Sequence, residues 1–249
     1  MDGKVLNERW LRWSECSLCE QRYHGVVHCA LGWACWKTYL ERPETDQDRI
    51  DAMMELGNGL HDAGKFEDAL SVREAELSMR LDDSEHNILA VQSNLANSYD
   101  LVGRREEATR LRRDVYSARL KLDGEEHEET LRAANNLAVS LKHLRRFEET
   151  KTLLRNTIPV ARRVLGEGNN ITLRMRWTYA RALSMYADAT LDDLREAVAT
   201  LEDAGRIAQR VLGGANPLTV DIEAALRAAR KPLRTAEERV KMAGEYRGA

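Results

Sequence analysis

The chain has 249 residues, of which 32% are charged and 6% aromatic, and its formal net charge is −3. This length allows one large or two small cores, and the composition favours helices with solvated outer faces over a β-rich core. The balance of acidic and basic residues gives no electrostatic reason to expect a nucleic acid or an anionic membrane as partner.

No targeting or membrane-spanning segment is visible in the sequence. Residues 1–10 carry charges and lack the apolar stretch of a signal peptide. The longest uncharged run, Gly25 to Trp36, is about half of the roughly 20 residues that a membrane-spanning helix needs. We therefore expect a soluble protein of the cytoplasm.

Residues 1–43 differ from the rest and are predicted to form a small N-terminal cap rich in cysteine and tryptophan. They hold all four cysteines and four of the five tryptophans. Two cysteines separated by two residues can reach the same Zn²⁺, and further Cys and His side chains follow within 20 residues. One structural Zn²⁺ would take at most four of the candidate ligands Cys16, Cys19, His24, Cys29 and Cys35.

A second interpretation of the same cysteines stays open. Cys29 and Cys35 can be small apolar residues in a helix over residues 29–40, whose Trp and Leu side chains pack on the first repeat. The second half of the segment lacks the paired ligands of a complete zinc finger. A disulfide framework is not expected in a chain without a secretory signal.

Residues 41–48 are polar, contain a proline and are predicted to link the cap to the repeats, with Thr45 or Asp46 capping the next helix. From Ile50 onward the chain repeats a helix A, a turn, a helix B and a loop. The tripeptide Asn94-Leu95-Ala96 recurs 42 residues later, and Thr130 recurs as Thr172. A fixed period of this size indicates a repeat protein.

The predicted fold is therefore all-α: a right-handed α-solenoid of antiparallel helix pairs over residues 50–230, with about four and a half units. The fourth unit is five residues longer, and the surplus is placed at residues 187–192. Within that stretch Asp192 and Asp193 are interpreted as a helix cap.

Two prolines are expected to interrupt or end helices. Pro159 lies inside the third helix B and must remove one helical hydrogen bond near Arg155. A closing helix is expected over residues 221–230, ended by Lys231-Pro232, with residues 231–249 as a charged C-terminal tail.

The pattern Leu-Gly/Ala-x2-Tyr/Leu, then Gly, then Ala resembles the tetratricopeptide consensus. It is carried by Leu56-Gly57, Leu60, Gly64 and Ala69, and by Leu95-Ala96, Tyr99, Gly103 and Ala108. The 42-residue period is similar to the variant found in kinesin light chains, whose loops carry His where this chain has His86, His127, Asn169 and Asn216. No heptad run precedes the repeats, so the resemblance implies a peptide-binding groove and not attachment to a motor.

In stacked helix pairs the helix A side chains line a concave groove. Asn amides can bind a peptide backbone, and Arg can hold a carboxylate through two parallel hydrogen bonds. The predicted groove residues are Asn58, Asn94, Asn97, Arg132, Asn135, Asn136, Arg174 and Arg181. The alternative is that Asn94 and Asn136 tie adjacent helices together or simply face water.

The motifs H-E-x-x-H, G-x-S-x-G and G-x-G-x-x-G do not occur in the sequence, and no catalytic residue is predicted. We predict a non-enzymatic scaffold or adaptor that binds a protein or an extended, acidic peptide. The alternative is a zinc-finger module at residues 16–35 that recruits a partner such as the ubiquitylation machinery.

Overall fold

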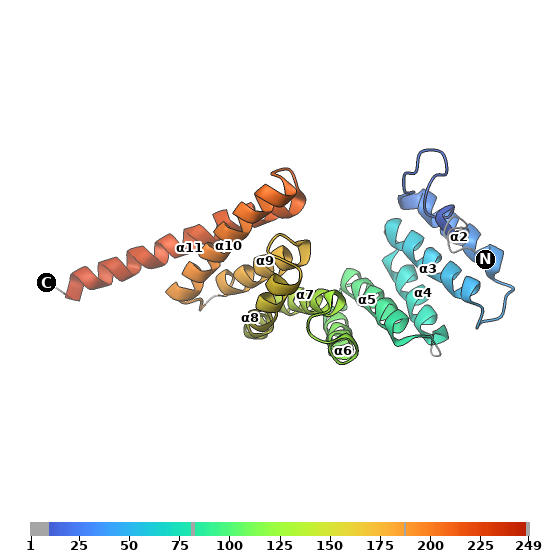
Figure 1. Ribbon diagram of the computed structural model, residues 1–249, viewed down its shortest axis with the longest axis horizontal. Helices are drawn as coiled ribbons and strands as arrows, with labels where there is room; N and C mark the ends of the chain where they lie inside the picture. The colour runs from blue at the N-terminus through green and yellow to red at the C-terminus, as the bar shows by residue number, and fades with distance from the viewer. Residues whose placement is uncertain (1–9, 81–82, 187, 248–249) are drawn as a thin grey trace. The chain divides into compact units, whose positions relative to one another are not determined.

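The computed structural model describes residues 10–80, 83–186 and 188–247. Its labelled helices are α2 (Gly25–Tyr39), α3 (Gln47–Asp62), α4 (Phe66–Met79), α5 (Glu85–Leu101), α6 (Arg105–Asp123), α7 (Glu128–His143), α8 (Phe147–Val164), α9 (Asn170–Ser184), α10 (Leu191–Leu212) and α11 (Pro217–Arg247) (Figure 1). The described residues contain no strand beyond one isolated β-bridge between Glu15 and Arg22. The predicted all-α fold is confirmed.

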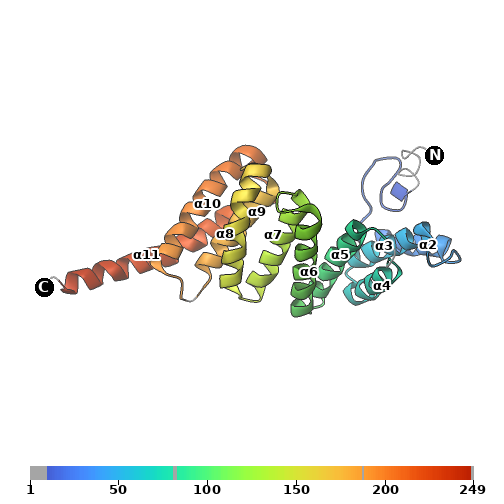
Figure 2. The same ribbon diagram turned by 60° about the horizontal axis from the view of Figure 1, so that its bottom comes forward.

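Consecutive helices form the predicted pairs of helix A and helix B. The pairs are α3 with α4, α5 with α6, α7 with α8, and α9 with α10. Figure 2 shows α7 to α10 side by side, each joined to the next by a loop. Across the described ranges, none of the helices is both long and apolar enough to cross a membrane.

The chain divides into two compact units, residues 1–115 (unit 1) and residues 116–249 (unit 2). The core of unit 2 is one apolar cluster, to which every helix from α7 to α11 contributes. Its fully buried members include Leu131, Leu154, Leu173, Leu201 and Ile222. Burial of these side chains supplies most of the driving force for stacking the helices.

The recurring threonine begins each helix A of unit 2 in the same way. The Thr130 hydroxyl donates to the carbonyl oxygen of Arg119, and the Thr172 hydroxyl donates to that of Ala161, both at 3.3 Å. Each bond joins the first turn of a helix A to the helix B before it. Thr219 is buried at the equivalent position of α11.

The loop residues before these helices act as N-caps. His127, Asn169 and Asn216 each accept a hydrogen bond from the backbone N–H two residues later. These caps satisfy backbone donors that the helix leaves unpaired. His86 differs, because it lies inside α5 and Ser84 caps that helix.

The other predicted capping positions are partly right. Asp46 caps α3 by accepting from the N–H groups of Asp48 and Arg49. The longer connection in the fourth unit lies at residues 185–190, of which residue 187 is outside the described residues. Its cap is Thr190, two residues before Asp192, and Asp193 completes a capping box, so neither aspartate is itself the cap.

The prediction that Lys231-Pro232 ends the closing helix is wrong. Helix α11 continues through Pro232 to Arg247. A proline inside a helix costs about 3 kcal/mol, because its ring removes one hydrogen bond and crowds the preceding turn. Beyond the proline, Leu233 packs on the unit 2 core and Glu237 pairs with Arg195 of α10 at 3.4 Å, so this part of the helix has tertiary contacts of its own. Helix α8 likewise continues through Pro159.

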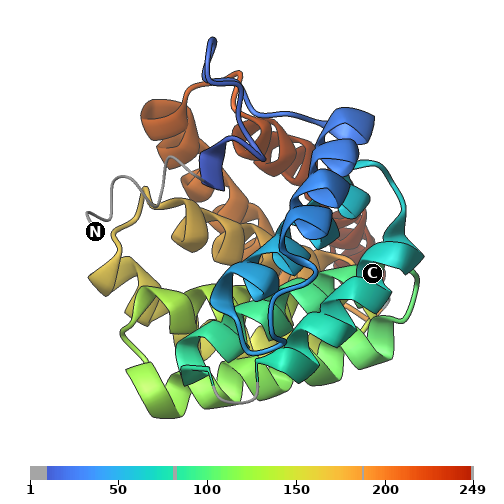
Figure 3. The same cartoon turned by 90° about the vertical axis from the view of Figure 1, so that its right-hand side faces the viewer.

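In unit 1 the N-terminal segment packs closely on the first repeat. An ideal Cβ on Gly32 of α2 would lie 2.9 Å from the Glu55 carbonyl oxygen, and one on Gly59 of α3 would lie 2.7 Å from that of His28. The two helix backbones are therefore in near contact. Figure 3 shows the blue loop that leads into α2, of which residues 10–24 are described.

The glycines of α3 yield a matched pair of substitutions. We expect Gly59→Ala to destabilise unit 1 by about 1–3 kcal/mol, because the new methyl group meets the α2 backbone. We expect Gly57→Ala to stabilise it by about 0.4–1 kcal/mol, because the nearest atom to its Cβ is Cγ of Arg73 at 3.5 Å and alanine favours the helix. Urea unfolding followed by circular dichroism measures both. Equal effects of the two substitutions would contradict the close contact.

Candidate functional site

The helix A positions of unit 2 are α7, α9 and α11, which pack side by side. We call the surface that they share the A-helix face. Residues three or four apart lie on the same side of a helix. By this spacing Arg132, Asn135 and Lys142 form one row on α7, and Arg174, Trp177 and Arg181 form one row on α9.

A pocket of about 360 Å³ lies between α9 and α11 on this face. Arg181 and Asp221 give it charged groups, and Met185, whose side chain is 48% exposed, gives it an apolar edge. Its full lining is Trp177, Arg181, Ser184, Met185, Asp221, Ala224, Ala225 and Ala228. Three alanines leave room for a side chain from another molecule.

Two cations lie close to the indole ring of Trp177. The Lys142 ammonium is 5.5 Å from the ring centroid and the Arg181 guanidinium is 5.2 Å from it. Burial, and then the positive charge of Arg181, lower the pKa of Lys142 to about 8. Over the described ranges, no carboxylate is recorded in an ion pair with either cation. The aromatic ring attracts both cations, and Asp221 lines the same pocket as Arg181.

Two neutral polar atoms of the same face are also without partners. Within the part of the chain that the structure describes, Asn135 Oδ1 and Trp177 Nε1 are buried and make no hydrogen bond. A buried polar atom without a partner costs about 1–3 kcal/mol. The A-helix face thus combines two cations, one donor and one acceptor that the fold leaves unsatisfied.

The remaining predicted groove residues of unit 2 already have partners or lie in solvent. Arg132 is exposed and pairs with Glu128 and Glu129. Arg174 is exposed and donates from Nε to Asn170 Oδ1 at 2.6 Å. Asn136 is half-buried.

In unit 1 two predicted asparagines make the same internal bond. Asn58 Oδ1 accepts from Arg73 at 3.2 Å, and Asn97 Oδ1 accepts from Arg112 at 2.8 Å. Each bond ties a helix A to its own helix B. Asn94 is exposed on α5.

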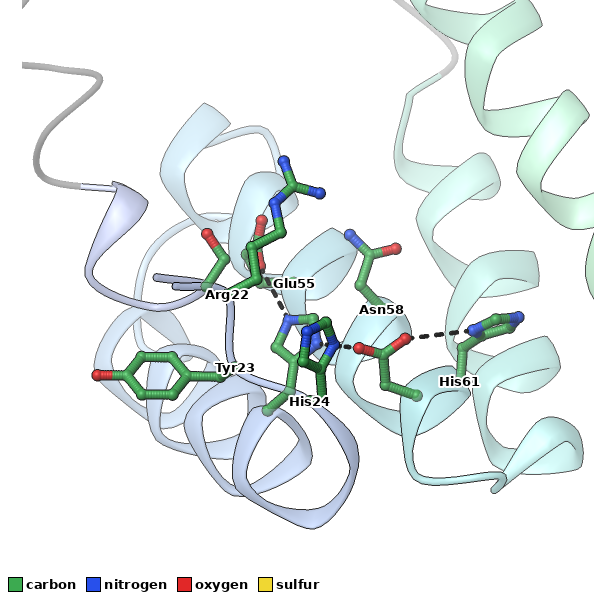
Figure 4. Close-up of a pocket in the computed structure, with 9 residues that line it drawn as sticks. Arg22, Tyr23, His24, Glu55, Asn58 and His61 are labelled. Carbon is green, nitrogen blue, oxygen red and sulfur yellow. Dashed lines mark hydrogen bonds and ion pairs between the residues drawn. The ribbon is translucent and has the colours of Figure 1, made fainter. Parts of the chain in front are cut away.

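A polar pocket of about 450 Å³ lies where α2, α3 and the preceding loop meet (Figure 4). His28 bridges two α3 carboxylates there, with Nδ1 2.7 Å from Asp62 and Nε2 3.8 Å from Glu55. Burial raises the pKa of Glu55. Burial also acts on Asp62, but its hydrogen bonds and charge contacts with His28 and His61 outweigh burial and lower its pKa. These ion pairs hold α2 against α3.

The five candidate zinc ligands are not gathered at one point. Cys29 packs with Leu56 and Leu60, whereas Cys35 belongs to a different apolar cluster. His24 lines the polar pocket. In the residues described, no group of three or more His, Cys, Asp or Glu side chains is placed to hold a metal ion. Only Cys16 and Cys19 are neighbours, and zinc binding stays a prediction.

Sequence reasoning missed Lys142 and Trp177. Both follow predicted groove residues at helical spacing, since Lys142 is seven residues after Asn135 and Trp177 is three after Arg174. Trp177 is also the only tryptophan outside residues 1–43. Extending each row along its helix would have found both residues.

The sequence and the fold were compared with known protein families and solved structures. The tetratricopeptide repeat family model matches residues 130–170, which hold most of α7 and all of α8. The crystal structure of BtubC (BKLC) from P. vanneervenii superposes with a TM-score of 0.65 at 20% identity, over 89% of this chain and 90% of that chain.

Two structures from Podosopora anserina, described as a kinesin light chain with nearly identical TPR-like repeats, have TM-scores of 0.64 and 0.63 at 20% identity. They cover 74% and 73% of this chain and 86% of their own. No curated protein matches the sequence. Residues 130–170 thus match the tetratricopeptide repeat, and the fold of the chain is similar to that of the kinesin light chain-like repeats.

Proposed function

We propose that the chain is a non-enzymatic scaffold or adaptor of the cytoplasm, and that it binds an extended, acidic peptide segment of a partner protein on the A-helix face. Tetratricopeptide solenoids present their helix A surfaces to protein or peptide partners. The proposal is more specific than this general role: it places binding on the A-helix face of unit 2 and names an acidic peptide as the ligand.

The observation that carries the proposal is the pair of cations around Trp177. Lys142 is 5% exposed and no carboxylate balances its charge in the described part of unit 2. A peptide carboxylate next to Arg181 would form charge-assisted hydrogen bonds and offset the repulsion between the two cations. A cationic or neutral segment would leave that repulsion in place.

The pocket beside Arg181 adds a second preference. Its wall of Ala224, Ala225 and Ala228 faces the half-exposed Met185. An apolar side chain next to the acidic group would bury itself there and displace water from the alanines. The site therefore favours a segment in which an apolar residue adjoins Asp, Glu or the C-terminal carboxylate.

Peptide arrays test this preference. We expect acidic peptides with an adjacent apolar residue to bind better than neutral or basic ones. We expect Arg181→Ala to weaken that binding about tenfold, equivalent to about 1.4 kcal/mol, because it removes a charged contact. The control is Arg206→Ala on α10, whose arginine is exposed and pairs with Asp203. Acidic binding that survives Arg181→Ala unchanged would contradict the site.

The buried ammonium also makes a pH prediction. The pKa of Lys142 is lowered from 10.5 to about 8 on folding, so the folded state loses this proton first as pH rises. The unfolded chain then binds more protons between pH 8 and 10.5, and stability should rise across that window. We expect Lys142→Met to remove this rise and to raise stability at pH 7 by about 1–3 kcal/mol.

Urea unfolding at a series of pH values measures the effect. Lys231→Met, at an exposed position of α11, is the matched control and should leave the pH profile unchanged. A loss of stability in Lys142→Met at pH 7 would mean that the contact with Trp177 outweighs the cost of burying the charge.

A further inference from the structure

The polar pocket of unit 1 is built on one side of α3. Glu55, Asn58 and Asp62 follow one another at spacings of three and four residues, so they lie on the same side of the helix and all line the pocket. Residues of the loop before α2, among them Arg22 and His24, line another part of it (Figure 4). The volume of about 450 Å³ is in the range of sites that hold small molecules.

His28 of α2 also lines this pocket, and the residue is 9% exposed. Its Nδ1 lies 2.7 Å from Asp62 Oδ2. An ionised carboxylate can only accept a hydrogen bond, so Nδ1 carries the hydrogen of this one. In the neutral imidazole ring Nε2 is then an acceptor. Nε2 is buried, and within the described residues it makes no hydrogen bond.

The group that Nε2 faces is a second acceptor. Glu55 Oε2 is 3.8 Å from Nε2, which is too far for a hydrogen bond. The Glu55 side chain is only 14% exposed, so little water reaches it. Two acceptors thus face each other and no donor joins them. Both side chains line the pocket, so a donor from outside would approach them from there.

The arginine and the aspartate of the pocket already have partners. Arg22, which is largely exposed, pairs with Glu15 at 3.3 Å. Asp62 is bonded to His28, and its Oδ1 lies 3.6 Å from Nδ1 of His61. The remaining acidic side chain of the lining is Glu55. The pocket therefore lacks a positively charged donor next to this carboxylate.

A primary ammonium group has the chemistry that Glu55 and His28 Nε2 lack. It carries a positive charge and three N–H donors, so it can bond to both acceptors at once. Such charge-assisted hydrogen bonds are about twice as strong as neutral ones. A metal ion fits less well, since over the described ranges no group of three or more His, Cys, Asp or Glu side chains is placed to hold one.

We propose that the pocket formed by α2, α3 and the preceding loop binds the ammonium group of a primary amine, with Glu55 as its counter-ion and His28 Nε2 as a second acceptor. A small alkylamine and the N-terminus of a peptide share this chemistry. The site lies in unit 1 and is separate from the A-helix face of unit 2, which is proposed to hold an acidic segment.

Calorimetric titration of the full-length chain tests the ligand chemistry. The probes are butylamine with butan-1-ol as its neutral control, and an alanine tripeptide amide with its N-acetylated form as control. We expect a free ammonium to bind and both neutral controls to fail. Tighter binding of butylamine would identify small amines as the ligand, and tighter binding of the tripeptide would identify a peptide N-terminus. Binding of neither amine would overturn the proposal.

Three variants test the residues. Glu55→Gln keeps the size of the side chain and should weaken amine binding about tenfold, because it removes the counter-ion. Arg22→Gln should strengthen it about twofold, because it removes a positive charge from the lining. Glu44→Gln, at an exposed side chain outside the pocket, is the control and should leave binding unchanged. Circular dichroism checks that each variant is folded. Unchanged binding in a folded Glu55→Gln would contradict the site.

The protonation of His28 gives a readout that needs no variant. Nitrogen-15 spectra of the free chain at mildly alkaline pH should show a hydrogen on Nδ1 and none on Nε2. Adding butylamine should shift the Nε2 signal as this atom accepts a hydrogen bond. A hydrogen on Nε2 in the free chain would overturn the proposal, because the contact with Glu55 would then already contain a donor.

Discussion

Two helix A elements of unit 2, α7 and α9, are joined to the preceding helix B by a buried threonine hydroxyl. Thr130 and Thr172 each donate to a carbonyl oxygen of the preceding helix B, at the same distance and one period apart. Buried hydroxyls usually find an acceptor, and these two bonds stabilise the contact between each helix A and the helix B before it, whereas the buried Thr219 hydroxyl of α11 makes no hydrogen bond within the described residues. The apolar core can then repeat with the same register from one unit to the next.

That register determines what the helix A surfaces can bind. With α7 and α9 packed together, Lys142 of one helix and Arg181 of the other both lie close to the Trp177 ring. Neither repeat alone would contain this arrangement. The polar atoms of Asn135 and Trp177 that lack partners in the described structure lie on the same helices. We therefore place the proposed peptide contact on this face of unit 2 and not on the asparagines of unit 1, whose side chains bond to arginines.

In unit 1 the backbone contact between α2 and α3 determines where Cys29 and Cys35 are buried. Gly32 and Gly59 allow the two helices to approach so closely that Cys29 and Cys35 enter separate apolar clusters. His28, bound between two carboxylates of α3, holds the same interface from its polar edge. Cys16 and Cys19 lie in the loop before α2, where Cys19 is exposed and Cys16 is half-buried.

The sequence by itself determined the period, the helix pairs and most of the caps, because these follow from local spacing and from side chains that bond within their own turn. The tertiary structure alone decided three matters. Asn58 and Asn97 bond to arginines fifteen residues away, α11 passes through Pro232 because α10 and the core support it, and the five candidate zinc ligands are separated. Each depends on which helices become neighbours, and helical periodicity within one segment carries no information about neighbours.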